Sequence, residues 1–296
     1  MKHTLIALLT LFLYLPLVAA DNDKPLPKDF KSLKALAEKG DAKAQYNLGS
    51  WYFFGVGVAK DKQEAEKWFQ KAADQGYAKA QFSLGVMYAL GQGVEEDFKE
   101  AAKWLRKAAD QGFASAQNGL GEMYYNGKGV EQDFKEAVKW YQKAADQGYA
   151  KAQNNLGVMY RRGQGVEQDF KEAFKWLRKA ADQGFVEAQK ILGVMYANGE
   201  GVLEDDKEAV KWYQKAADQG HAQAQSHLGI NYFLGEGVLE DYVAAYAWWN
   251  ISAANGHADS KNNKGLLLKQ LTPDQIAKAE DLVKEMIKKN PKLLNK

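Results

Sequence analysis

The side chains that proteins use most often for catalysis or metal binding are sparse in this sequence. Among 296 residues there are four histidines and no cysteine, which excludes thiol nucleophiles, thiolate metal sites and disulfides. His221 and His257 replace an aromatic residue that recurs along the chain, as at Tyr149, so we interpret them as packing residues. His227 stands alone, and His3 lies in an N-terminal segment that we expect to be removed. We predict no metal, no cofactor and no catalytic residue.

Two other motifs resemble ligand-binding loops but lack what those loops need. A Gly-x-Gly-Val motif recurs six times, first at 55–58, without the third glycine of a dinucleotide loop or the Gly-Lys-Ser/Thr of a phosphate loop. The run Glu204-Asp205-Asp206 lacks the alternating ligand spacing of a calcium loop. Every repeat offers an equivalent Asp and Glu, so no glycosidase-like pair can be singled out. We predict that the glycine motifs are turns and that the chain is not an enzyme.

The bulk composition is that of an ordinary soluble protein. Hydrophobic residues make up 46% of the chain and charged residues 26%, and 40 basic residues nearly balance 38 acidic ones. Nucleic-acid binders usually gather Lys and Arg into a patch, whereas here the two signs are interleaved. The composition therefore argues against nucleic acid as a partner.

The first twenty residues have the three regions of a secretory signal peptide. A basic start (Met1-Lys2-His3) precedes an apolar run over 4–18, and the small residues of Val18-Ala19-Ala20 precede a polar stretch. An uncleaved membrane anchor is the alternative, but a span usually needs about 18 or more apolar residues, and this run is shorter and contains Pro16. We expect residues 1–20 to be cleaved, no stable membrane insertion afterwards, and a periplasmic or secreted location in a bacterium.

A 36-residue period runs through the rest of the chain. Glycines recur at this interval from Gly40 to Gly256, and tryptophans recur from Trp68 to Trp248, with no insertion or deletion. Such a period is the signature of a solenoid, in which each unit buries its apolar face only by stacking on its neighbours. We expect the recurring tryptophans to lie in this core and not to form a sugar-binding set.

Each period is predicted to form a helical hairpin. In one unit the apolar stripe over 78–90 indicates a first helix, and glycines after it end that helix. Asp97 then begins a second helix, with Glu100 placed to complete a capping box. The same logic over the whole chain predicts an all-α solenoid of fifteen helices: a capping helix, seven first helices, six second helices and a terminal helix. We assign 1–20 to the signal peptide, 21–28 to a short segment, 29–268 to the solenoid and 269–296 to a C-terminal capping helix.

The repeated unit Gly-Tyr-Ala-Lys-Ala-Gln, then Leu-Gly-Val-Met-Tyr, Gly-Gln-Gly-Val and Trp-x-x-Lys-Ala-Ala-Asp-Gln resembles the Sel-one-like repeat, a relative of the tetratricopeptide repeat. The resemblance covers about 29–268 and implies a right-handed superhelix of α/α hairpins that serves in scaffolding, signalling complexes or host contact. Some exported members carry a disulfide in each hairpin and have been associated with β-lactams. This chain has no cysteine, so that activity is not carried over.

Four positions of each first helix differ most between the repeats, and we call the face that they form the variable face. In tetratricopeptide-type hairpins the equivalent face lines the concave groove. The asparagine side chains of this face could form hydrogen bonds with a peptide backbone. Arg161 and Arg162 could pair with a carboxylate of a partner. The predicted partner-binding residues are Tyr46, Phe53, Phe82, Asn118, Tyr125, Asn126, Asn154, Arg161, Arg162, Lys190, Asn198 and Phe233.

These observations favour an exported, monomeric scaffold that binds a peptide or helix of another protein. Random drift on a solvated helix face would also make these positions variable. Two other functions remain open from the sequence: a regulator or chaperone of a cell-envelope enzyme, and an enzyme acting on peptidoglycan or β-lactams. No motif supplies the nucleophile of the latter.

Overall fold

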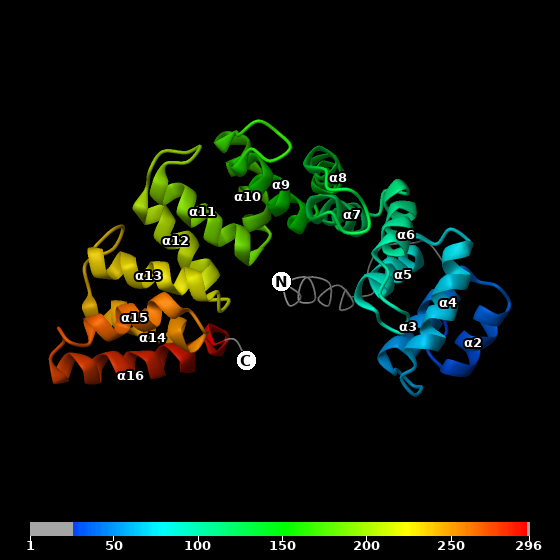
Figure 1. Ribbon diagram of the computed structural model, residues 1–296. Helices are drawn as coiled ribbons and strands as arrows, with labels where there is room; N and C mark the ends of the chain where they lie inside the picture. Colours follow the sequence, from blue (N-terminus) through cyan, green and yellow to red (C-terminus); the bar gives the residue numbers. More distant parts are fainter. Residues whose placement is uncertain (1–25, 295–296) are drawn as a thin grey trace. The chain divides into compact units, whose positions relative to one another are not determined.

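The computed structural model describes residues 26–294, so the signal peptide predicted at 1–20 lies outside the described residues. Fifteen α-helices and one short 3-10 helix follow one another, and the described range contains no strand (Figure 1). The prediction of an all-helical solenoid of stacked hairpins is confirmed, and so is the predicted number and order of helices. No helix within 26–294 is long and apolar enough to cross a membrane.

The first helices of the hairpins begin 36 residues apart, as the period requires. They are α3 (Ala42–Phe54), α5 (Ala78–Leu90), α7 (Ala114–Asn126), α9 (Ala150–Arg162), α11 (Val186–Asn198), α13 (Ala222–Leu234) and the shorter α15 (Ala258–Leu267).

Within each unit, the second helices pack against the first helices that precede and follow them. They are α4 (Lys62–Asp74), α6 (Phe98–Asp110), α8 (Phe134–Asp146), α10 (Phe170–Asp182), α12 (Asp206–Ala217) and α14 (Tyr242–Ala254). The ends are α2 (Phe30–Glu38), α16 (Pro273–Lys289) and the 3-10 helix η2 (Pro291–Leu293).

The hairpins form two compact units, one ending at Gln147 and the other beginning at Gly148. In each unit alanines and the recurring tryptophans fill the core; Trp104 is 4% exposed and Trp212 is 2% exposed. This confirms that the tryptophans of the repeat are core residues. Burial of these large side chains between neighbouring helices supplies the main favourable free energy of folding.

Two glycine positions show how closely the chain packs. A Cβ on Gly85 in α5 would lie 2.7 Å from Leu105 Cγ and 3.2 Å from the Ala101 carbonyl oxygen of α6, so the two helices of a hairpin approach closely only because glycine is there. Gly129 has a φ of 70°, and a Cβ there would collide with the backbone carbonyl of Phe98 in the preceding hairpin. The Gly-x-Gly-Val motifs are therefore turns, as predicted. The turn also packs on the preceding repeat at Gly93, Gly129, Gly201 and Gly237.

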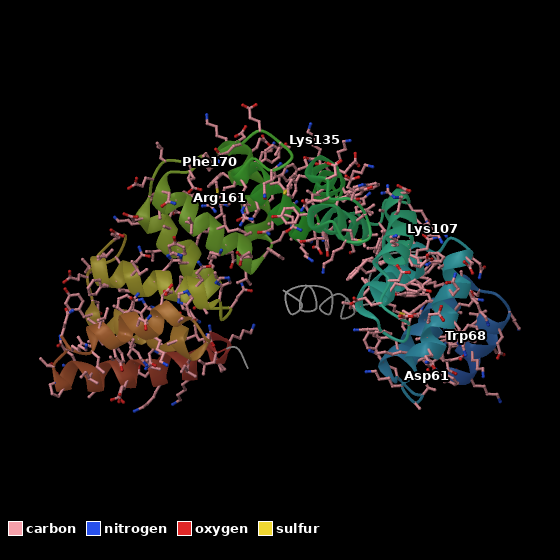
Figure 2. All side chains as sticks on the ribbon, viewed as in Figure 1. Asp61, Trp68, Lys107, Lys135, Arg161 and Phe170 are labelled. Carbon is pink, nitrogen blue, oxygen red and sulfur yellow. The ribbon has the colours of Figure 1, made fainter. Side chains whose placement is uncertain are left out.

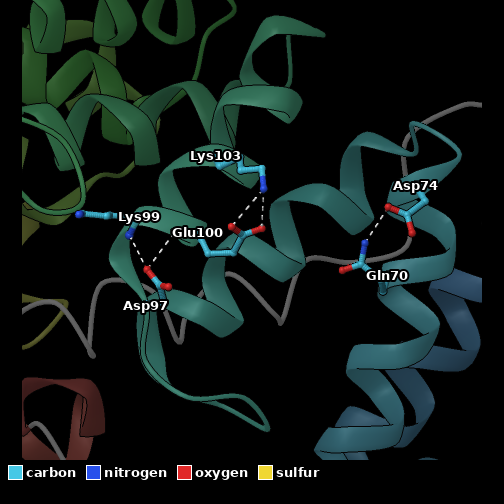
Figure 3. Close-up of polar contacts among 6 residues, drawn as sticks. All are labelled: Gln70, Asp74, Asp97, Lys99, Glu100 and Lys103. Atoms are coloured by element: carbon cyan, nitrogen blue, oxygen red, sulfur yellow. Dashed lines mark hydrogen bonds and ion pairs between the residues drawn. The ribbon is translucent and has the colours of Figure 1, made fainter.

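The predicted capping box at Asp97 is half right (Figure 3). The Asp97 carboxylate accepts hydrogen bonds from the backbone N–H groups of Lys99 and Glu100, at 2.8 and 3.0 Å. Glu100 does not reach back, because the Asp97 N–H already donates to the Tyr88 carbonyl of the first helix; its carboxylate instead pairs with Lys103. A complete capping box occurs at the start of α16, between Thr272 and Gln275.

A buried glutamine ladder joins the two helices of every hairpin. The Gln81 side-chain amide donates to the Ala73 carbonyl at 3.1 Å, and its oxygen accepts from the Gln111 amide at 2.7 Å. Equivalent side-chain pairs, with distances of 2.7 to 2.9 Å, are Gln45–Gln75, Gln117–Gln147, Gln153–Gln183, Gln189–Gln219 and Gln225–Asn255. Because buried amides are costly unless they are paired, this ladder specifies the register of each hairpin.

The C-terminal segment completes the last rung of this ladder. Asn255 replaces the glutamine of the other repeats, and the Leu293 carbonyl accepts from both Gln225, at 2.8 Å, and Asn255, at 2.7 Å. The Leu293 side chain is 3% exposed and packs in the cluster that contains Trp248 and Ile251. Together with α16, which packs on α14, η2 thus covers part of the last complete hairpin.

Candidate functional site

In the six first helices from α3 to α13, the last residue is the most accessible position of the variable face. In the unit ending at Gln147 these residues include Phe54, which is 41% exposed, and the exposed Asn126. In the unit beginning at Gly148 they are Arg162 and Asn198, which are exposed, and Leu234, which is 52% exposed. This row, one residue per repeat within each unit, offers aromatic, polar, cationic and aliphatic groups to a partner.

Four of the predicted partner-binding residues are buried instead. The exposed fractions are 5% for Phe53, 9% for Phe82, 2% for Asn118 and 6% for Asn154. Phe82 shows the reason: its ring packs edge-to-face on Phe113 at 5.3 Å, in the interface between successive first helices.

Three more aromatic residues of the predicted set are half-buried and pack on rings of their own unit. Tyr46 contacts the rings of Phe69 and Tyr77, Tyr125 contacts Phe134, and Phe233 contacts Trp249 and Tyr242. Whether any of the twelve residues contacts a partner stays a prediction.

Arg161, labelled in Figure 2, is already paired within the protein. Its guanidinium binds Glu200, on the loop after the next first helix, through two bonds of 2.6 and 3.1 Å. Asn198 also donates to this carboxylate at 3.0 Å. The hydrogen bonds from Arg161 lower the pKa of Glu200, despite its partial burial. A partner carboxylate would have to displace Glu200 to reach Arg161. The exposed Arg162 forms no ion pair with another residue of the range 26–294.

Lys190 takes part in a second charged cluster in the same unit. Its ammonium pairs with Glu187 at 2.6 Å, and Glu187 also contacts His221 Nε2 at 3.0 Å. Burial alone would raise the pKa of Glu187, but the bonds to His221 and Lys190 outweigh it and lower the pKa to about 2. The cluster links α11 to the start of α13 and is satisfied internally.

The histidines have structural roles that differ from the sequence interpretation. His221 and His257 do not simply replace an aromatic ring, because their Nδ1 atoms accept from the backbone N–H groups of Ala224 and Ser260 and so cap α13 and α15. His227 lies on the ring of Tyr213, with centroids 4.6 Å apart. Burial, with Lys190 and the other two histidines nearby, lowers its pKa to about 4. The described residues contain no group of three or more His, Asp or Glu that could hold a metal ion.

One feature of the variable face was not predicted from the sequence. A small hollow of about 30 Å³ lies between α5, α6 and α7. Val86, Ala89, Leu105 and Met123 belong to its apolar wall, and Gly119 lines it as well. The available signal was a glycine in the middle of a first helix, where most other repeats carry a larger side chain.

Comparison with known proteins identifies the repeat. The model of the Sel1 repeat matches six consecutive segments: 42–77, 78–113, 114–149, 150–185, 186–221 and 222–257. The chain belongs to the Sel1 repeat family. The match confirms the resemblance drawn from the sequence. Sel1 repeat proteins generally act as scaffolds for protein–protein interaction and are typically not catalytic.

Solved structures agree with this assignment. The chain is 34% identical to a Sel1 repeat protein from Oxalobacter formigenes, with a TM-score of 0.69 over 76% of this chain and 91% of that one. It is 31% identical to c5321, a protective antigen of uropathogenic Escherichia coli strains with an SLR fold, over 89% of this chain and 72% of that one, with a TM-score of 0.41. The structural likeness therefore rests on the Oxalobacter protein. No match was found among curated proteins.

Proposed function

We propose that this Sel1 repeat protein is an exported scaffold that binds a peptide or helix of a partner protein on the variable face of its first helices. The observation that carries the proposal is the contrast between positions within one repeat. The glutamine ladder, the capping aspartates and the core tryptophans recur from repeat to repeat, while the exposed row on the first helices changes chemistry at every step.

Physical reasoning supports the use of this row as a contact surface. Exposed side chains at the ends of rigid helices are held in place by packing below them, so a partner that contacts them orders few additional groups. Each unit presents several such positions, and a segment that touches several repeats gains contact area without any one strong pocket. Export is proposed from the N-terminal segment alone, and the periplasm or the exterior would then supply the partner.

The test is a comparison of two triple variants as affinity baits, each purified after expression of the full chain. The first removes exposed groups of the variable face: Asn126→Ala, Arg162→Ala and Asn198→Ala. Its matched control carries Lys103→Ala, Lys139→Ala and Lys175→Ala, three exposed positions on second helices whose solvent-screened ion pairs with neighbouring glutamates contribute little to stability.

We expect a partner from envelope or extracellular fractions to be retained by the wild type and by the second-helix control, and to be lost by the first variant. Circular dichroism would establish that both variants remain folded. Equal retention by all three baits would place binding elsewhere on the molecule and would contradict the proposal.

A further inference from the structure

The hollow between α5, α6 and α7 has a specific origin, which bears on the partner and rests on the proposed function. It lies wholly in the unit that ends at Gln147. Val86 and Ala89 line it from α5, Phe98 and Leu105 from α6, and Met123 from α7. Apolar walls of this kind favour an apolar occupant, since water gains few hydrogen bonds there.

The hollow coincides with a side chain that one repeat lacks. Gly119 lies above Leu105, and a Cβ added to it would meet the Leu105 Cδ atoms at 3.5 and 3.7 Å. In two later repeats the equivalent residue is large: Ile191 packs in the cluster that contains Leu177, and His227 stacks on Tyr213 at 4.6 Å. The hollow therefore lies where those repeats place a large side chain.

Folding does not require glycine at this position. The 3.5 and 3.7 Å separations are ordinary van der Waals contacts, and Gly119 lies inside α7 without a positive φ. Glycine in a helix interior is less stable than alanine. Gly121, two residues later, differs: a Cβ there would lie 2.7 Å from the buried Tyr141 ring. Close packing explains Gly121 but not Gly119.

The mouth of the hollow adds a charge preference. Glu122, Asn126 and Lys128 line it. Glu122 accepts a hydrogen bond from Asn118 at 2.9 Å, so its carboxylate is engaged within the protein. The Lys128 ammonium lies 4.9 Å from the centre of the Phe98 ring, and no carboxylate among the described residues forms an ion pair with it. The Glu122 carboxylate keeps its negative charge, and Lys128 is the cation at the mouth with which a carboxylate of a partner can pair.

We propose that this hollow receives one aliphatic side chain from a peptide segment of a partner protein, and that an adjacent aspartate or glutamate of the same segment pairs with Lys128. The aliphatic side chain takes the place that Ile191 fills in its own repeat. The exposed Asn126 at the mouth is placed to bond the peptide backbone of the same segment.

The experiment uses a phage-displayed library of random dodecapeptides, selected on protein purified after expression of the full chain. Enriched sequences are then synthesised with a fluorescent label, and their affinity is measured by fluorescence polarisation. We expect the enriched peptides to share Leu, Ile or Met next to Asp or Glu. The Gly119→Ile variant, which fills the hollow from within, should lower their affinity by about tenfold or more, since one well-buried aliphatic side chain is worth that much.

Three further variants keep the result interpretable. Asn47→Ile makes the same substitution at the equivalent position of α3 and should leave binding unchanged. Lys128→Glu should weaken the acidic peptides and favour versions in which Lys replaces the acidic residue. If Gly119→Ile does not fold, Gly119→Ala fills part of the space and should give a smaller loss.

Several outcomes would overturn the inference. Some peptides could bind the wild type and Gly119→Ile equally but not bind the triple variant of the variable face. That result would support the scaffold function and refute the proposal that the hollow receives a peptide side chain. Failure of any dodecapeptide to be enriched would refute the peptide occupant. A dimer in sedimentation that Gly119→Ile dissociates would show that a second copy of the chain occupies the hollow instead.

Discussion

Two glycines of α7 should respond in opposite directions to the same substitution. Gly119 and Gly121 are both helical, both buried and two residues apart, so Gly→Ala gives each the same gain in helix propensity, about 0.8–1.0 kcal/mol. At Gly119 the new methyl makes ordinary contacts with Leu105 at 3.5 and 3.7 Å. Gly119→Ala should therefore stabilise the protein by about 1 kcal/mol.

At Gly121 the methyl has no such space. It would lie 2.7 Å from two atoms of the Tyr141 ring and 3.3 Å from the Ala137 carbonyl oxygen. Tyr141 is 3% exposed and has little room to shift, so α7 and α8 must separate. Overpacking of this kind costs about 1–3 kcal/mol. A cost in the middle or upper part of that range exceeds the gain in helix propensity. We expect Gly121→Ala to destabilise the protein by about 1–2 kcal/mol, roughly 2–3 kcal/mol below Gly119→Ala.

The assay is urea denaturation followed by circular dichroism, with hydrogen exchange of α7 amides as a local probe. The second probe matters because a repeat protein can unfold in parts, and a single transition then reports an average over repeats. A shift of both variants in the same direction, in both probes, would refute the reasoning from close approach. Destabilisation by Gly119→Ala alone would show that the hollow is needed for packing, and would also weaken the inference about its occupant.

Three other results are expected. Gln81→Leu should cost about 1–3 kcal/mol because it removes two hydrogen bonds, one to the Ala73 carbonyl and one from the Gln111 amide. A double-mutant cycle in urea with Gln111→Ala should show a coupling of about 0.5–1.5 kcal/mol, and zero coupling would contradict the ladder. The pKa of His227 near 4 lies below its unfolded value, so the unfolded chain takes up a proton first and stability falls from about pH 6.5 towards pH 4, by about 2 kcal/mol at pH 5. The variant His227→Ile should remove most of that pH dependence in urea titrations at pH 7.5 and pH 5. In a Gram-negative host, the tagged wild-type chain should be recovered from the periplasm or medium with a shortened N-terminus, whereas Leu8→Arg with Leu9→Arg should keep the full-length chain in the cytoplasm. Identical fractionation of the two would contradict export.

The period made most of the fold predictable. Hairpin boundaries follow from Gly-x-Gly-Val turns and Asp caps, and α5 begins and ends at the residues expected from the apolar stripe. The error at Asp97 came from a non-local competitor. Its backbone N–H is taken by the Tyr88 carbonyl of the preceding helix, and no local motif encodes a bond between two elements.

The variable face was harder to predict, because variation between repeats does not separate exposed residues from interface residues. Asn118 and Asn126 both vary, yet Asn118 is 2% exposed and Asn126 is exposed. A single first helix carries both interface residues and exposed residues. In α7 the two kinds lie only about two turns apart. The pairing of Arg161 with Glu200 could not be predicted either, since the two residues lie 39 residues apart in the sequence.

Repeat architecture itself explains how binding chemistry can vary without loss of the fold. Because each hairpin contacts mainly its neighbours, the free energy of unfolding is close to a sum of local terms, and those terms come from the glutamine ladder, the Asp caps and the alanine–tryptophan core. A change at an exposed position such as Asn126 touches none of these. A Cβ added at Gly119 contacts only Leu105. The fold therefore places little constraint on the size of the residue at that position. A hollow can therefore open in one repeat and be filled in others, as Ile191 and His227 illustrate, while the rest of each hairpin keeps its register.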